Sequence, residues 1–135
     1  MKANGKSEYK LTVALLTHNR CASGFLKKAL EAILAQTYTD FELLVVDNHS
    51  SDHTAELVMK YEDPRLTYIR QPAGGNATTS YIRSSHMSRG EYIIFAHDDD
   101  VMEPTMIERQ LEFAKRYPDL LVISNNVSLI DESES

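Results

Sequence analysis

The length, composition and charge of the sequence limit what this protein can be. Its 135 residues suit one domain with a real core, and 42% hydrophobic with 25% charged residues exclude a disordered chain. No apolar run approaches the roughly 20 residues of a membrane-spanning helix, and a net charge of −6 argues against general affinity for nucleic acid. An anionic partner therefore needs help from a metal ion or from backbone dipoles.

The amino-terminal stretch is polar and shows no periodicity. It lacks the apolar core of a secretory signal, so we expect a cytoplasmic protein whose residues 1–9 form a flexible arm. Any contact with a membrane surface would come from regions outside this sequence. The single cysteine, Cys21, has no disulfide partner and no cysteine neighbour for a zinc site, so we interpret it as part of a loop that enters a helix.

Apolar runs alternate with segments of helical periodicity along the chain. The runs predict strands at residues 11–16, 41–46, 66–69, 92–96 and 120–123. Predicted helices run from a cap at Ser23 to about Gln36, from Asp52 to before Asp63, over 77–88 as a short or irregular helix, and from Pro104 to Pro118. This order predicts an α/β, Rossmann-like domain over 10–124, with a mostly parallel sheet and helices on both faces. Residues 125–135 form a polar tail, which we interpret as a truncated continuation.

The stretch GEYIIFAHDDDVMEP, residues 90–104, places acid at the end of a strand that we expect to be buried on both faces. Asp98, Asp99 and Asp100 repel one another unless a cation is present, so they indicate a site for a hard divalent ion. Mg²⁺ takes only one or two protein carboxylates beside substrate phosphates. The alternative is an exposed acidic turn that favours the positive end of the helix after Pro104.

Three polar strand ends are predicted to meet. Residues 17–20 (THNR), Asp47 and the acidic triplet each follow a strand, and parallel strands all end at one edge of a sheet. Neither the dinucleotide fingerprint G-x-G-x-x-G after the first strand nor a P-loop is present.

These motifs, in this order, resemble the inverting family-2 nucleotide-sugar glycosyltransferases of the GT-A fold. The resemblance covers about residues 10–123 and rests on VALLTHNR (13–20), LEAILAQTYTDFELLVVDNHSSDHT (30–54) and GEYIIFAHDDDVMEP (90–104). The last stretch is most similar to the bacterial spore-coat type, with its acid pair before a third polar residue. The resemblance implies a GT-A nucleotide-diphospho-sugar transferase fold.

The resemblance also implies roles for individual residues. Thr17, His18 and Asn19 would lie around the nucleotide, although an exposed loop histidine is the alternative for His18. Asp47 would accept hydrogen bonds from the uracil or ribose, where the alternative is a turn-capping carboxylate. Asp99 would bind Mn²⁺ or Mg²⁺ on the donor diphosphate, with Asp98 facing ribose or metal and Asp100 as a further metal candidate.

Two positions depart from the family pattern. The commoner metal loop has an acid where this chain has His97, which leaves the division of work within the acidic triplet open. Many relatives carry Arg-Asn in the helix before Gly90, where this chain has Tyr81-Ile82. Arg83 could replace that phosphate contact, or be an exposed helical arginine.

The resemblance predicts the donor-binding half of a transferase. The family's general base and acceptor site lie well downstream of the metal loop, so we expect them beyond Ser135. The predicted reaction moves a sugar from a nucleotide-diphosphate donor, such as a UDP-sugar, to an unknown carbohydrate or other hydroxyl acceptor. The alternative is a catalytically incomplete nucleotide-binding module of the same fold. A receiver-like signalling domain would instead carry its acids after the first and third strands, with a lysine near the last.

Overall fold

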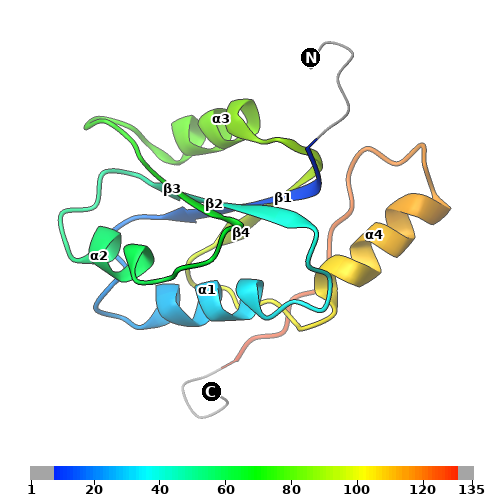
Figure 1. Ribbon diagram of the computed structural model, residues 1–135, viewed down its shortest axis with the longest axis horizontal. Helices are drawn as coiled ribbons and strands as arrows, with labels where there is room; N and C mark the ends of the chain where they lie inside the picture. The colour runs from blue at the N-terminus through cyan, green and yellow to red at the C-terminus, as the bar shows by residue number, and fades with distance from the viewer. Residues whose placement is uncertain (1–7, 131–135) are drawn as a thin grey trace.

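The computed structural model describes residues 8–130 and contains a four-stranded sheet. The strands are β1 (Tyr9–Thr17), β2 (Phe41–Asp47), β3 (Leu66–Arg70) and β4 (Gly90–His97), and they lie in the order β3-β2-β1-β4. Every neighbouring pair is parallel. The helices are α1 (Phe25–Leu34), α2 (Thr54–Met59), α3 (Ala77–Met87) and α4 (Met106–Arg116). The predicted α/β architecture is confirmed, with α3 on one face of the sheet and α1 and α2 on the other (Figure 1).

The two faces of the sheet carry separate hydrophobic cores. Side chains alternate along a strand, so Leu15 and Val45 belong to one core whereas Leu16 and Val46 belong to the other. The larger core includes residues from three helices, namely Leu26, Ala29, Leu30 and Ile33 of α1, Val58 of α2 and Ile107 of α4. The smaller core consists of Leu16, Leu44, Val46 and Ile69, with Tyr81 of α3 packed against it. Most of the apolar burial therefore lies on the α1 face.

Helix α3 is regular over 11 residues, so the prediction of a short or irregular helix is wrong. A capping box explains its start, because Asn76 Oδ1 accepts from Thr79 N at 3.0 Å while Thr79 Oγ1 accepts from Asn76 N at 2.8 Å. Its serines bond within the helix, as Ser84 Oγ does to Ser80 O at 2.9 Å. The capping box therefore stabilises the first turn of a helix whose serines and threonines have low helix propensity.

The other helices begin slightly later than predicted. The residue before α1 is Gly24, with a left-handed φ of 74°, and not Ser23. His53 precedes α2, although Asp52 still stabilises its first turn by accepting from Thr54 N at 3.0 Å. Helix α4 follows Thr105, and Pro104 lies just before it.

Strand β4 differs from the sequence-based expectation in its burial. We predicted a strand buried on both faces, but Tyr92 and Phe95 are 37% and 38% exposed. Among the described residues β4 pairs only with β1 and lies at the edge of the sheet. An edge strand has neighbours on one side only, so apolar content alone overstated its burial.

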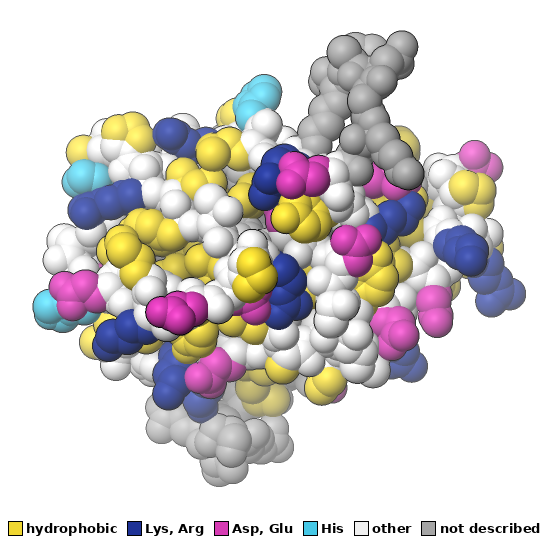
Figure 2. Space-filling model, in the orientation of Figure 1, with side chains coloured by type: hydrophobic (Ala, Val, Ile, Leu, Met, Phe, Trp, Pro, Cys, Tyr) yellow, Lys and Arg dark blue, Asp and Glu magenta, His cyan; other side chains and the backbone are white. Residues whose placement is uncertain are grey.

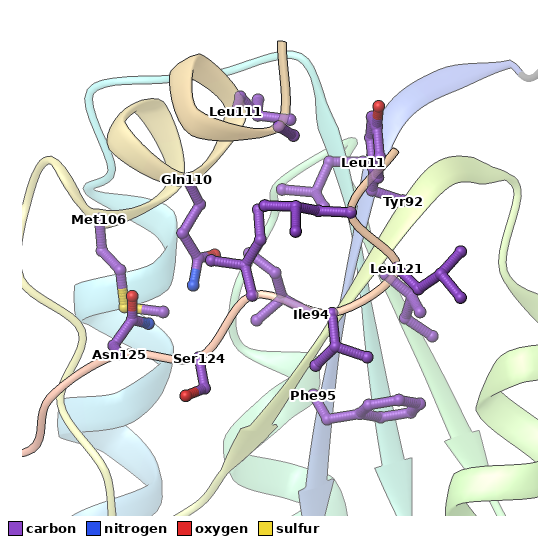
Figure 3. A pocket seen from close by; sticks show the side chains of 15 residues that line it. Leu11, Tyr92, Ile94, Phe95, Met106, Gln110, Leu111, Leu121, Ser124 and Asn125 are labelled. Atoms are coloured by element: carbon purple, nitrogen blue, oxygen red, sulfur yellow. The ribbon is translucent and has the colours of Figure 1, made fainter. Parts of the chain in front are cut away.

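The predicted fifth strand at 120–123 is also wrong within the described structure. No helix or strand is assigned to residues 120–130, and Leu121 and Val122 are 98% and 81% exposed. A strand requires a neighbour that completes its hydrogen-bond ladder, which an apolar run does not supply by itself. This segment runs beside β4 and α4 without pairing (Figure 3).

The chain ends fall partly outside the described residues. Strand β1 begins at Tyr9, inside the predicted arm, whereas residues 1–7 and 131–135 lie outside the described part. Between residues 8 and 130, no helix is long and apolar enough to cross a bilayer. Acidic and basic side chains are interspersed on the face shown in Figure 2, so this face presents a mixed charge distribution.

Candidate functional site

The ends of β1 and β4 bring the predicted polar residues together. The parallel register pairs Leu16 with His97, so Thr17 and Asp98 both emerge at the same edge of the sheet. Thr17 Oγ1 donates to Asp98 Oδ2 at 2.8 Å, and His18 N donates to the same oxygen at 3.3 Å. Asp98 is only 8% exposed. The predicted convergence of these two strand ends is therefore confirmed.

A guanidinium connects two of the three predicted acids. Arg20 Nε lies 3.5 Å from Asp98 Oδ1, and Arg20 Nη2 lies 3.9 Å from Asp99 Oδ2. The Asp99 side chain is 53% exposed, and Asp100 is also exposed. Asp100 N donates to His97 O at 3.3 Å, which forms the turn after β4. Solvent exposure therefore differs within the triplet, because Asp98 is nearly buried whereas Asp99 and Asp100 are exposed.

Asp47 lies at the neighbouring strand end but is fully buried. Its Oδ1 accepts from Ser50 N at 2.8 Å and from Ser50 Oγ at 2.6 Å, while Oδ2 accepts from Tyr68 OH at 2.5 Å. Burial, followed by this bond to Asp47, raises the pKa of Tyr68, so the phenol stays a donor. Both carboxylate oxygens of Asp47 therefore already accept hydrogen bonds from other groups of the protein. Contact between Asp47 and a uracil or ribose stays a prediction.

The loops after β1 and β2 are tied to each other. Asn19 has a left-handed φ of 52°, a conformation that asparagine tolerates better than most residues. Its N donates to Ser50 Oγ at 2.8 Å, and its Oδ1 accepts from Ser51 N at 2.8 Å. Cys21 N donates to Asp52 Oδ2 at 3.1 Å. In this structure Asn19 thus connects the two loops, and its predicted nucleotide contact stays a prediction.

A cavity of about 280 Å³ opens at this edge of the sheet. Within residues 8–130, Oδ1 of Asn48 is buried beside it without a hydrogen-bond partner. The lining residues come from the ends of β1 and β4, the loops that follow β1 and β2, and the first turns of α3: Leu16, Thr17, His18, Arg20, Asn48, Ala77, Ser80, Tyr81, His97 and Asp98. The cavity therefore combines a carboxylate, a guanidinium and two imidazoles.

Seven of the ten lining residues were not among the predicted site residues, and three of these seven carry an ionisable or aromatic side chain: Arg20, Tyr81 and His97. Tyr81 and His97 are the two positions that depart from the family pattern, and they contact each other, with Tyr81 OH 3.1 Å from His97 Nε2. The sequence signal that could have found them is that both positions differ from the family pattern. Arg20 stood within the quoted loop, but its pairing with acids about 80 residues away required the fold.

A second, larger groove has a different character. It measures about 460 Å³ and lies between β4, α4 and residues 120–125 (Figure 3). Ile94, Leu111 and Leu121 are among its lining residues, and no charged or histidine side chain from residues 8–130 contributes to the lining. Its apolar lining contrasts with the polar, charged cavity at the carboxyl edge.

The carboxyl-edge residues fit a hard divalent cation that also binds a diphosphate. Asp98 Oδ1 and the exposed Asp99 carboxylate are oxygen ligands of the type that Mg²⁺ and Mn²⁺ prefer. No group of three or more His, Cys, Asp or Glu side chains in the described residues is arranged as a complete metal site. Two carboxylates with diphosphate oxygens and water would form a suitable ligand set.

Comparison with known proteins identifies the family. Residues 12–134 match Glycosyl transferase family 2, which covers most of the chain. The chain belongs to glycosyl transferase family 2. The family-2 chain is 30% identical over 127 residues to glycosyltransferase GlyA of Streptococcus pneumoniae, which covers 93% of this chain and 18% of GlyA. The finer likeness to the spore-coat type stays a prediction.

Solved structures confirm the GT-A fold. S. aureus TarS 1-349, solved in complex with UDP-GlcNAc, matches with a TM-score of 0.72 and 23% identity, over 81% of this chain and 32% of that one. The mannosyltransferase PcManGT of Pyrobaculum calidifontis, solved with GDP-Man and Mn²⁺, matches with a TM-score of 0.68 and 21% identity, over 84% of this chain and 33% of that one. The family-2 chain spans less than half the length of the curated relatives it matches.

Proposed function

We propose that this family-2 domain binds the diphosphate part of a nucleotide-sugar donor at the carboxyl edge of its sheet. The observation that carries the proposal is the position of Asp98, which is bonded to Thr17 and His18 and faces Arg20 on a polar cavity. The donors bound by the structural neighbours, UDP-GlcNAc and GDP-Man, support the same ligand class.

Asp98 and Asp99 would hold Mn²⁺ or Mg²⁺, with Asp100 as a further candidate. The Mn²⁺ bound to PcManGT supports this assignment. When bound, the ion supplies positive charge that stabilises the leaving diphosphate. Thr17 and the backbone N–H of His18 keep the Asp98 carboxylate oriented toward the cavity, because both donate to its Oδ2.

The nucleotide would lie along the loops that follow β1 and β2. The His18 side chain is exposed on the cavity lining and its Nδ1 lies 2.8 Å from Asn48 O, so the imidazole has a defined orientation. Asn48 Oδ1 is buried without a hydrogen-bond partner, so it would accept from a donor group of the ligand only after a shift of this loop. Asp47 would bind the base or ribose directly after a shift of Ser50 or Tyr68, or otherwise act by holding this loop in place.

We further propose that the whole enzyme transfers the sugar to a hydroxyl acceptor with inversion, and that its general base lies outside residues 1–135. A base must deprotonate the acceptor as it attacks the anomeric carbon in line. The second candidate is a nucleotide-binding module without turnover.

The test is calorimetric titration of UDP and, separately, of GDP into the 135-residue chain with Mn²⁺ and with EDTA. We expect binding at least about tenfold tighter with Mn²⁺, because the net charge of −6 opposes a bare diphosphate. The preferred nucleotide identifies the donor base. Equal affinity in Mn²⁺ and EDTA would remove the argued metal role of the acids. Sugar transfer by the family-2 chain itself would place the base within these residues.

A further inference from the structure

The backbone of Arg20 is held on both sides, while its side chain is partly exposed and makes only long contacts. The preceding Asn19 bonds to the loop after β2 through Ser50 and Ser51, and the following Cys21 bonds to Asp52. The Arg20 side chain is 43% exposed, and its contacts with Asp98 and Asp99, at 3.5 and 3.9 Å, are longer than a close charge-assisted hydrogen bond. The Arg20 backbone therefore has a defined position, while the guanidinium makes only weak contacts with its two carboxylate partners.

The two oxygens of Asp98 have different partners. Oδ2 accepts from Thr17 Oγ1 and from the backbone N–H of His18, which are part of the rigid strand end. Oδ1 faces only the Arg20 guanidinium among the interactions of the described residues. A cation that binds Oδ1 together with the Asp99 carboxylate therefore competes with one partly exposed side chain, that of Arg20.

We propose that Arg20 is a counter-ion that a divalent cation displaces from Asp98 and Asp99, and that the displaced guanidinium then binds the donor diphosphate. A guanidinium near two carboxylates weakens binding of a further cation by direct repulsion. Once displaced, it lies beside the metal site, where a diphosphate presents oxygens that match its paired N–H donors. The metal and the nucleotide then strengthen each other's binding.

The inference rests on the proposed donor site, but its measurable consequence is separate. Coupling between two ligands is reciprocal, so the factor by which Mn²⁺ strengthens UDP binding equals the factor by which UDP strengthens Mn²⁺ binding. Removing Arg20 relieves repulsion of the free metal and also removes a diphosphate contact. The variant should therefore bind Mn²⁺ alone more tightly, UDP with Mn²⁺ more weakly, and show a smaller coupling factor.

The experiment measures free Mn²⁺ by electron paramagnetic resonance and UDP binding by calorimetry, in Arg20→Gln and in wild type. We expect Mn²⁺ alone to bind about two- to fivefold more tightly to Arg20→Gln, the range for a partly exposed ion pair. Binding of UDP with Mn²⁺ should weaken by about tenfold, the effect of losing a charged hydrogen-bond partner. The matched control is Lys115→Gln in the last turn of α4, at the end of the molecule away from the carboxyl edge (Figure 1). It removes the same charge and should change neither affinity.

A second variant of Arg20 separates the effect of its positive charge from that of its paired N–H donors. Arg20→Lys retains the positive charge, so its affinity for Mn²⁺ alone should stay within about twofold of wild type, while UDP binding weakens because the two-pronged contact is lost. Unchanged Mn²⁺ affinity and an unchanged coupling factor in Arg20→Gln, with normal binding of UDP and Mn²⁺ by wild type, would overturn this inference and leave the donor site standing. Failure of wild type to bind UDP with Mn²⁺ would overturn the donor site and the inference with it.

Discussion

The strand ends of β2 and β4 both carry aspartate, yet the two sites have opposite character. Asp47 is fully buried and accepts three hydrogen bonds from Ser50 and Tyr68. Asp99 is half exposed and lies near a single loosely held guanidinium. A carboxylate that accepts hydrogen bonds from buried donors stabilises the fold. A carboxylate whose partner is exposed and distant can exchange that partner for a ligand. The comparison shows that position at the carboxyl edge does not by itself assign a ligand role.

The largest expected effect is on folding, from Asp47→Ala. The change leaves Ser50 N, Ser50 Oγ and Tyr68 OH without their acceptor in a buried site. We expect the free energy of unfolding to fall by about 3 kcal/mol, and Tm to fall on the order of 10 °C. Thermal melting without ligand measures this. A variant that melts like wild type but binds UDP with Mn²⁺ tenfold more weakly would instead assign Asp47 to the ligand.

Asp99→Asn should give the converse result. Loss of the exposed carboxylate removes a metal ligand, so binding of UDP with Mn²⁺ should weaken roughly ten- to a hundredfold while Tm stays within about 1 °C. Calorimetry measures the nucleotide affinity, and thermal melting of the same preparation measures Tm. A large drop in Tm with normal nucleotide binding would show that Asp99 is structural.

Tyr68→Phe tests whether the buried network around Asp47 depends on the phenol. The variant removes the hydroxyl that donates to Asp47 Oδ2 and retains the ring. We expect the free energy of unfolding to fall by about 1 kcal/mol, less than for Asp47→Ala because one bond is lost and not three. Denaturant titration provides the measurement. Equal destabilisation by the two variants would contradict the assignment of two bonds to Ser50.

The smallest expected effect is a pH dependence from Asp52. Burial alone would raise the pKa of Asp52, but hydrogen bonds from Thr54 and from Cys21 N outweigh it and hold the pKa below the ordinary 3.8. A lowered folded pKa means that the carboxylate stabilises the fold at neutral pH, and that this contribution is lost as the pH falls from about 4 through the lowered pKa. Asp52→Asn should therefore flatten the loss of Tm below pH 4. An unchanged slope would show that other carboxyls account for it.

Much of the fold was predictable because it follows from local patterns. Apolar runs such as 41–46 and 66–69 became β2 and β3 with one residue added at the end of each, and the predicted helix from Ser23 to about Gln36 became α1. The predictions that failed for the strands concern pairing and burial across the chain. Residues 120–123 have the apolar content of a strand but no neighbour, and Tyr92 and Phe95 lie on an edge strand.

The sequence by itself determined the order of the four strands and four helices that the described residues form, the family resemblance and the position of acids after two strands. Only the tertiary structure decided which acid is buried and which is accessible, because that depends on residues far away in the chain. Tyr68 reaches Asp47 across 21 positions, and the Thr17 hydroxyl reaches Asp98 across 81. Hydrophobic periodicity repeats every few residues and can be read locally, whereas a hydrogen-bond partner at the edge of a sheet is assigned only when the strands align.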